Sequence, residues 1–154
     1  MDDKEHWEAL YRSAVPRVYR ALLATLRNPA LAEDALHDAF AEGLRRPPSH
    51  DDNLSGWLFR VALRRARRRR WPFAPLPAHA RAGTDELAAA LDQLEAGRLL
   101  ALLTERQRAL VVAHYYLGLT HAEAAALFGV RPGTVSATIA QSLARMRKGT
   151  SHVL

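Results

Sequence analysis

The chain has 154 residues, of which 49% are hydrophobic, so it can build one ordinary domain or two very small ones and is not a disordered chain. It contains no cysteine, which excludes a disulfide framework, a zinc–thiolate site and thiol chemistry and fits a reducing cytoplasm. The formal net charge of +6 and the pI of about 10.5 favour a polyanionic partner such as nucleic acid, although an Arg-rich proteome would give the same totals.

The composition is rich in Leu, Ala and Arg and poor in alternating β-branched runs, which predicts an all-α fold. The first expected helix covers residues 4–27, because apolar side chains recur there at three- and four-residue steps. Pro16 lies inside this pattern and should bend or break the helix. The pair Asn28-Pro29 indicates a turn, after which a second helix is expected over residues 30–45.

A loop over residues 47–53 separates the second helix from a third, which is expected over residues 56–70 with Ser55 as its N-cap. Prolines and a glycine over residues 72–84 then predict a linker, along which two small domains would move relative to each other. A helix over residues 85–102 would begin the second domain.

Two capping boxes mark further helix starts in the second domain, each a Thr followed three residues later by Gln or Glu. One opens a helix over residues 104–117, and the other opens a short helix over residues 120–128. Gly118 and Gly129 follow them as the expected turns.

Residues 120–147 form a candidate helix-turn-helix. Gly129 allows the sharp turn, Val130 can fill the core between the two helices, and Pro132 begins a last helix that extends to about Lys148. A plain helical hairpin would have the same shape, but the capping boxes and the glycine placement favour a DNA-binding unit.

The third expected helix carries a dense group of arginines. Like charges packed this closely repel one another, and a phosphate backbone would offset that cost through charge-assisted contacts and counterion release. A solvated helix end would show the same pattern. The occurrence of this basic helix in the same chain as a helix-turn-helix nevertheless favours nucleic acid as its partner. Trp57, at the start of this helix, is more often a core residue than a base-stacking platform. The arginines that share one face are Arg60, Arg64, Arg67 and Arg68.

Five segments, in this order and spacing, together resemble the extracytoplasmic-function sigma factors. Residues 32–40 resemble the polymerase-binding helix of that family, and residues 57–62 resemble the start of its promoter-melting helix. Residues 102–108 and 118–125 resemble the start of its C-terminal domain, and residues 129–135 resemble its recognition-helix signature. The resemblance covers nearly the whole chain.

The resemblance implies a two-domain, non-enzymatic sigma factor that needs no cofactor or metal and directs promoter-specific initiation by core RNA polymerase. Residues 4–71 would dock on the polymerase clamp and melt the proximal promoter, residues 72–84 would be the linker, and residues 85–149 would read the distal element of promoter DNA. The implied polymerase-binding residues are Glu33, Asp34, His37, Asp38 and Phe40. The implied proximal-element residues are Asn53, Arg60, Arg64, Arg65, Arg67 and Arg68. The implied recognition-helix residues are Arg131, Thr134, Ser136, Thr138 and Gln141.

The charges agree with this division. Glu33, Asp34 and Asp38 are acidic and do not favour DNA, so a protein surface is their better partner, although solvated charge near a helix N-terminus would look the same. Family members are often inhibited by an anti-sigma factor on or between the domains, which is a further partner that the resemblance implies.

The sequence departs from the family pattern in both DNA-facing helices. In the recognition helix, Arg131 is the one cation at the start, and loss of several phosphate contacts should weaken distal-element binding steeply, because each contact contributes to the salt-dependent part of the affinity. Ser, Thr and Gln side chains can still contact base edges. In the third helix, Arg64 and Arg68 replace the usual Asn and Asp, and His37 stands where Gln is usual. The recognition-helix positions that are usually basic or follow the basic ones hold Ser136, Ala137, Thr138 and Gln141.

Two other functions fit the same residues. A stand-alone helix-turn-helix regulator would need a dimer to occupy two half-sites, and no obvious dimerisation helix is present. A degenerate sigma-like adaptor would bind polymerase and hardly read promoters. An enzyme is disfavoured, because the seven His residues show no HExxH spacing and no Gly-rich phosphate loop is present. His50 with Asp51 and Asp52 is a weak metal candidate.

The start of the chain is acidic and lacks the pattern of a signal peptide. The longest apolar run, residues 99–103, is too short to span a bilayer. We therefore expect a cytoplasmic protein without membrane insertion.

Overall fold

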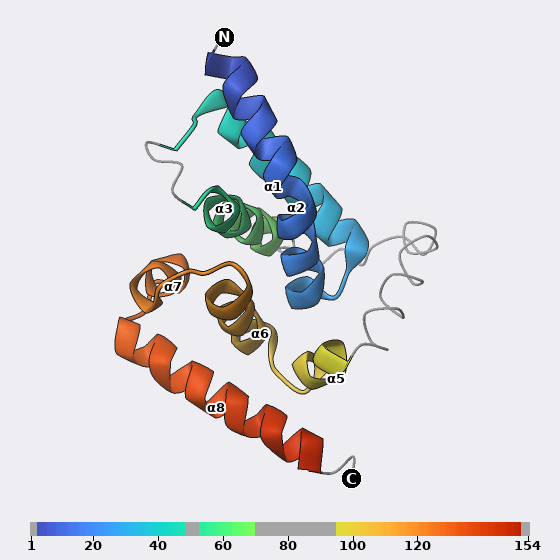
Figure 1. Ribbon diagram of the computed structural model, residues 1–154, viewed down its shortest axis with the longest axis vertical. Helices are drawn as coiled ribbons and strands as arrows, with labels where there is room; N and C mark the ends of the chain where they lie inside the picture. The colour runs from blue at the N-terminus through green and yellow to red at the C-terminus, as the bar shows by residue number, and fades with distance from the viewer. Residues whose placement is uncertain (1–2, 49–52, 70–94, 152–154) are drawn as a thin grey trace.

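The computed structural model describes residues 3–48, 53–69 and 95–151, and the regular structure in these ranges is entirely helical (Figure 1). The all-α prediction is confirmed. The predicted linker over residues 72–84 and the first part of the helix predicted over residues 85–102 lie outside the described residues. The elements are α1 (Asp3–Leu26), α2 (Pro29–Arg45), α3 (Leu54–Arg69), α5 (Glu95–Ala101), α6 (Glu105–Val111), the π-helical turn η2 (Val112–Tyr116), α7 (His121–Phe128) and α8 (Pro132–Ser151).

The N-terminal cluster consists of α1, α2 and α3, which pack on one another around apolar side chains. Pro16 does not break α1: its ring is exposed and the helix is continuous through it. Tyr11 and Val18, on either side of Pro16, are fully buried and hold both halves of the helix in the core. α2 begins as the turn signal predicts, because the Asn28 side chain accepts a hydrogen bond of 3.1 Å from the Leu31 amide.

The start of α3 differs from the prediction. The helix begins at Leu54, two residues earlier than expected, and Asn53 rather than Ser55 provides the cap. The Asn53 Oδ1 accepts a hydrogen bond of 2.9 Å from the Gly56 amide, and its carbonyl accepts one of 3.0 Å from the Trp57 amide. Asn and Ser are comparable caps, so the local pattern alone did not separate the two positions.

In the C-terminal cluster both predicted capping boxes are present. The Thr104 hydroxyl accepts from the Gln107 amide at 3.2 Å, and the Thr120 hydroxyl accepts from the Glu123 amide at 3.1 Å, with the reciprocal bonds also formed. The helix that Thr104 caps, α6, continues directly into the wider turn η2. Gly129 ends α7 with φ of 63°, the left-handed conformation that favours glycine.

The helix-turn-helix core is small and lies between α6, α7 and α8. Ala124 and Ala125 on α7 allow close approach of α8, whose Val135 and Ile139 are buried against Leu110. Val130 packs on this core, as predicted. The α7–α8 arrangement therefore leaves one side of the first turns of α8 facing outward.

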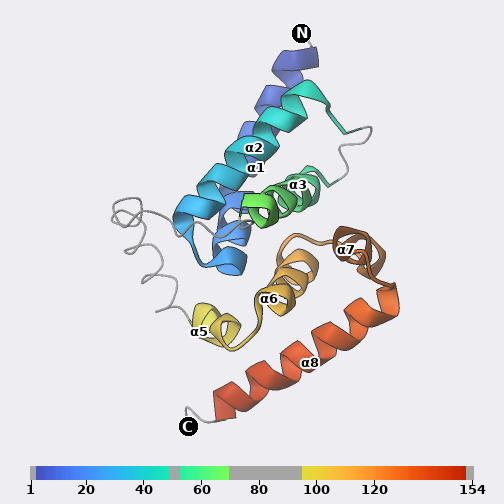
Figure 2. The same ribbon diagram turned by 180° about the vertical axis from the view of Figure 1, so that it is seen from behind.

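The two clusters share one apolar core. The C-terminal cluster contributes α6, η2 and the residues after them, which lie against α1 and α3, and both opposed views show α6 beneath α3 (Figures 1 and 2). Leu117, Leu119 and Leu127 are buried in the same core as Leu58 of α3. The relative movement that the linker composition predicts stays a prediction, because a single arrangement does not measure it.

Candidate nucleic-acid interface

The acidic side of α2 is open. Glu33, Asp34 and His37 are exposed and Asp38 is half-buried, while the opposite face of the helix lies in the core. Phe40 differs from these four, because its ring packs against the core. The ring meets that of Tyr11 edge-on, with 5.5 Å between the two ring centres. The structure therefore brings together the four polar members of the predicted polymerase-binding set and turns the fifth toward the core.

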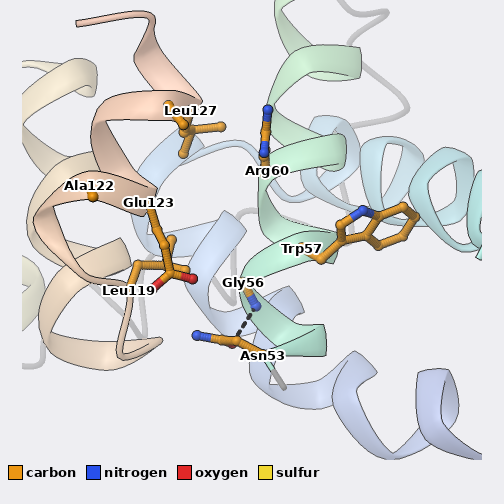
Figure 3. A pocket seen from close by; sticks show the side chains of 9 residues that line it. Asn53, Gly56, Trp57, Arg60, Leu119, Ala122, Glu123 and Leu127 are labelled. Carbon is orange, nitrogen blue, oxygen red and sulfur yellow. Dashed lines mark hydrogen bonds between the residues drawn. The ribbon is translucent and has the colours of Figure 1, made fainter. Parts of the chain in front are cut away.

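At the start of α3 a cavity of about 470 Å³ lies between the two clusters (Figure 3). Asn53 lines it with both ends of its amide engaged, since Oδ1 caps α3 and Nδ2 donates to the Leu117 carbonyl at 3.1 Å. Trp57 also lines the cavity and is partly buried. The centre of its ring lies 6.2 Å from that of Tyr11. The residues that line the cavity are Asn53, Gly56, Trp57, Arg60, Leu119, Ala122, Glu123, Ala126 and Leu127.

Arg60 is the cation of this cavity. Its Nε atom is buried and donates to no partner among the described residues. Burial lowers the pKa of the Arg60 guanidinium from its usual range, and the neighbouring Arg64 charge lowers it further. A buried donor without an acceptor is costly, so a phosphate or base oxygen at this position would be stabilising.

The other arginines of α3 point in different directions. Arg64 and Arg68 are exposed to solvent. Arg65 faces α2 and pairs with the Glu42 carboxylate at 3.2 Å. The exposed Arg67 places its guanidinium 4.7 Å from the centre of the Phe128 ring, on α7 of the other cluster. The four arginines predicted to share a face therefore divide: Arg64 and Arg68 are exposed, whereas Arg60 and Arg67 are directed at the C-terminal cluster.

The recognition helix presents an almost neutral outer side. Thr134, Ser136 and Gln141 on α8 are exposed, as is Arg131 just before the helix. Thr138 is half-buried, so it is the member of the predicted set least available to a base edge.

Three contacts between the clusters have no signal in the sequence. The Arg108 Nε donates to the Thr25 carbonyl at 2.9 Å, and the Arg27 guanidinium donates to the Gly97 carbonyl at 3.4 Å. The Arg17 guanidinium donates to the Tyr116 carbonyl and lies 5.1 Å from the centre of its ring. The acceptors are backbone carbonyls, which every residue carries, so no pattern of residue types predicts these pairs.

Two further predictions concern sites elsewhere. The weak metal candidate at His50, Asp51 and Asp52 lies outside the described residues. Within the described ranges, no three His, Asp or Glu side chains gather as a metal site would require. No helix in the part of the chain that the structure describes is long and apolar enough to cross a membrane.

Each helical cluster matches the model of a known protein family. Residues 10–71 match the model of sigma-70 region 2, and residues 93–146 match that of sigma-70 region 4. The ECF RNA polymerase sigma factor SigM of Mycobacterium tuberculosis is 32% identical over 157 aligned residues, which cover 95% of this chain and 78% of SigM. The ECF RNA polymerase sigma factor SigK of Mycolicibacterium vanbaalenii is 26% identical and covers 95% of this chain and 82% of SigK.

The matched regions coincide with the two helical clusters, in the order that the sequence motifs indicated. This similarity distinguishes the chain from a stand-alone helix-turn-helix regulator, which has no counterpart of region 2. It also places the chain among proteins that are not enzymes. The chain therefore belongs to the extracytoplasmic-function sigma factors, which bind core RNA polymerase and promoter DNA and direct transcription initiation.

Proposed function

We propose that the two clusters divide the work of initiation as follows: residues 4–71 dock on polymerase and open the proximal promoter, and residues 85–149 read the distal element. The observation that carries this proposal is the separation of charge between neighbouring helices. The outward face of α2 is acidic, whereas α3, packed beside it, is basic. A polyanion is attracted to one and repelled by the other, so the two helices suit different partners.

For polymerase binding, the proposal assigns the contact to Glu33, Asp34, His37 and Asp38. These side chains leave the same side of α2, and the helix is fixed from behind by its buried apolar face. Phe40 acts indirectly, because its ring packs on Tyr11 and holds α2 in place.

Charge reversal on α2 tests this assignment. Asp38→Arg should weaken co-elution with bacterial core RNA polymerase by about tenfold or more, because it puts a cation into an acidic contact surface. Glu5→Arg is the matched control, since Glu5 is an exposed acid on α1. Equal loss in both variants would contradict the assignment to α2, and no loss in either would leave α2 without a role in docking.

For promoter DNA, the proposal assigns the proximal contact to Asn53 and the arginines of α3, and the distal contact to the exposed side of α8. Arg64 and Arg68 are open to a phosphate backbone in the structure as it stands. Arg60 and Asn53 would contribute once the C-terminal cluster no longer covers them. Arg65 would act as a support, because it is paired with Glu42.

We also propose that the protein works in the cytoplasm, where core polymerase and promoter DNA are found, and that an anti-sigma factor inhibits it. An apolar groove of about 430 Å³ between α1, α5 and η2 offers such an inhibitor a binding surface, with the exposed Tyr115 at its edge. Tyr115→Ser should then raise expression from dependent promoters in cells that contain the inhibitor and leave transcription with purified polymerase unchanged. Unchanged expression in such cells would remove the groove from consideration.

A further inference from the structure

A small cavity lies where the end of α2 meets α3. Its volume is about 280 Å³, and all the described residues that line it are charged: Glu42, Arg45 and Arg46 at the end of α2, and Arg65 on α3. Small-molecule sites usually occupy about 300–1,000 Å³. The cavity is therefore of a size for one small ionic group, or for the end of a ligand that extends into solvent.

The cavity has an excess of positive charge. Its three guanidinium groups and one carboxylate have a net charge of +2. The Glu42 carboxylate lies 3.2 Å from the Arg65 guanidinium and offsets that cation. Arg45 and Arg46 are exposed and form no ion pair with any residue that the structure describes. Their two charges repel each other, so an anion between them would be stabilising.

The end of α2 positions two of these arginines. A cation in the last turn of a helix is favoured by the negative end of the helix, which accounts for Arg45. Arg46 is the C-cap, and its amide donates to the Glu42 carbonyl at 2.8 Å. The following Pro47 restricts Arg46 to an extended backbone, as its φ of −140° shows. Arg65 comes from the second half of another helix, so the electrostatics of a helix end do not explain its presence here.

The core fixes the separation of the two sides of the cavity. Ala39 on α2 and Ala62 and Ala66 on α3 are fully buried in the core that the two helices share. Arg65 directly precedes Ala66, and its side chain lies at the margin of that core, about one third exposed. The backbone that carries the arginines is therefore in place before any ligand binds, which lowers the cost of binding.

The charge and size of the cavity fit a phosphate group with two negative charges. A phosphomonoester carries about −1.5 to −2 near pH 7 and has three strong acceptor oxygens. A guanidinium group presents paired N–H donors to such oxygens. A phosphate of the nucleic-acid backbone is a diester with about one negative charge, so it would balance only part of the charge of the cavity.

We propose that this cavity, the α2–α3 arginine site, binds the terminal phosphate of a small phosphorylated molecule, with Arg45 and Arg46 on one side and Arg65 on the other. Glu42 lowers the affinity, because it competes with the phosphate for Arg65. The bound molecule joins the end of α2 to α3 and so stabilises the N-terminal cluster. Arg64 and Arg68, the exposed arginines assigned to promoter DNA, are not part of the site.

Calorimetric titration of the full chain with inorganic phosphate and with pyrophosphate, at low salt, tests the site. We expect saturable binding with a Kd of about 1 mM or tighter. Arg45→Gln/Arg46→Gln should weaken binding by at least about tenfold, because two charge-assisted contacts are lost. Both side chains are exposed, so the core is not disturbed.

Arg12→Gln/Arg20→Gln is the matched control, because it removes the same charge from exposed positions on α1. It should change phosphate affinity by less than about twofold. Absence of saturable binding by wild type, or equal losses in the two double variants, would overturn the site.

Removal of the acid should have the opposite effect. Glu42→Gln releases Arg65 from its ion pair, so inorganic phosphate should bind about three- to tenfold more tightly. Glu5→Gln makes the same change in total charge at an exposed acid on α1 and should have little effect. Weaker binding by Glu42→Gln, or a gain that Glu5→Gln shares, would contradict the part that Arg65 plays in the site.

Two further titrations identify the class of phosphate. Dimethyl phosphate has one negative charge, as a backbone phosphate does, and should bind at least about tenfold more weakly than inorganic phosphate. A labelled single-stranded oligonucleotide should bind wild type and Arg45→Gln/Arg46→Gln with affinities within about threefold of each other. Equal binding of dimethyl and inorganic phosphate, or a loss of oligonucleotide affinity as large as that of Arg64→Gln/Arg68→Gln, would assign these arginines to the nucleic-acid backbone and overturn the proposal.

Discussion

The two helices to which we assign promoter DNA, α3 and α8, combine charge and exposure in opposite ways. α3 has six arginines among its 16 residues, yet the cavity at its start is walled by the other cluster. α8 is exposed along its outer side, yet its cations, Arg145, Arg147 and Lys148, all follow the first thirteen residues of the helix. Counterion release makes phosphate contacts the main source of affinity. The first turns of α8 are thus exposed and neutral, whereas on α3 Arg64, Arg67 and Arg68 are exposed and the Arg60 Nε is buried beside the other cluster.

The largest expected effect comes from removing open charge on α3. Arg64→Gln/Arg68→Gln should weaken binding of the holoenzyme to melted promoter DNA by about tenfold at physiological salt, and lower the slope of log K against log salt by about 1.5 to 2. Both side chains are exposed, so the core is not disturbed. Fluorescence anisotropy across a salt series measures both quantities.

Arg12→Gln/Arg20→Gln is the control for net charge. Both residues are exposed cations on α1, so the change in total charge is the same and its place differs. We expect a slope change well below that of the α3 pair. Equal changes would mean that affinity follows net charge and that α3 has no special part in it.

A smaller effect is expected from adding charge to α8. Ser136→Arg puts a cation on the exposed side of the first turns of α8, which has no cation before Arg145. Affinity for duplex DNA that contains the distal element should rise by about three- to tenfold and the salt slope by about 0.9. The companion Ser136→Ala separates charge from base reading, because it removes a hydroxyl and leaves the charge unchanged. A loss of promoter preference with Ser136→Ala would show that the neutral helix reads bases after all.

Local patterns predicted the helices well, because the forces that define them act within one turn. Both capping boxes and the left-handed Gly129 appear where the sequence places them. The basic face of α3 was also visible, since it follows from helical spacing alone. The cap of α3 was assigned to Ser55 instead of Asn53 because either residue can do the work at neighbouring positions.

The relation between the two clusters was not predictable in the same way. It depends on Leu119 entering the space over Gly56 and on guanidinium groups finding carbonyl oxygens on the other cluster. Neither the fit of a side chain into a space nor a hydrogen bond to a backbone carbonyl produces a pattern of residue types in the sequence. The sequence therefore predicted two domains joined by a linker and a candidate site on each, and could not show that the C-terminal cluster packs against the start of α3.

The backbone of the helix-turn-helix is the next test, and two of its glycines should respond to substitution with opposite signs. Gly129 has φ of 63° and open space around its Cβ position, so Gly129→Ala should cost about 1 kcal/mol through backbone strain alone. Gly133 also has open space but lies in α8. Gly133→Ala should therefore stabilise the protein by up to about 1 kcal/mol. Urea unfolding of both variants checks the opposite signs, and two losses of equal size would contradict the strain argument.

The Tyr11 ring packs on Trp57 at the start of α3. Removal of the Tyr11 hydroxyl should have the smallest effect on the unfolding free energy at neutral pH. The Tyr11 hydroxyl is buried without a partner among the described residues, and burial raises the pKa of Tyr11 to about 12. Tyr11→Phe keeps the ring that packs on Trp57 and removes the unpaired oxygen. At pH 7 the unfolding free energy should stay level or rise by less than about 1 kcal/mol.

The difference between wild type and Tyr11→Phe should change with alkaline pH in one direction. Below about pH 10, Tyr11 is neutral in both the folded and the unfolded chain, so its ionisation contributes nothing to the difference. Between about pH 10 and 12 the unfolded chain releases the phenolic proton while the folded chain retains it, so only wild type loses stability through this group. The variant should therefore gain on wild type as pH rises, by up to about 2–3 kcal/mol near pH 12. Unfolding at matched alkaline pH values measures that gain, and two parallel curves would mean that the hydroxyl is solvated and that α3 rests on a looser core than the structure shows.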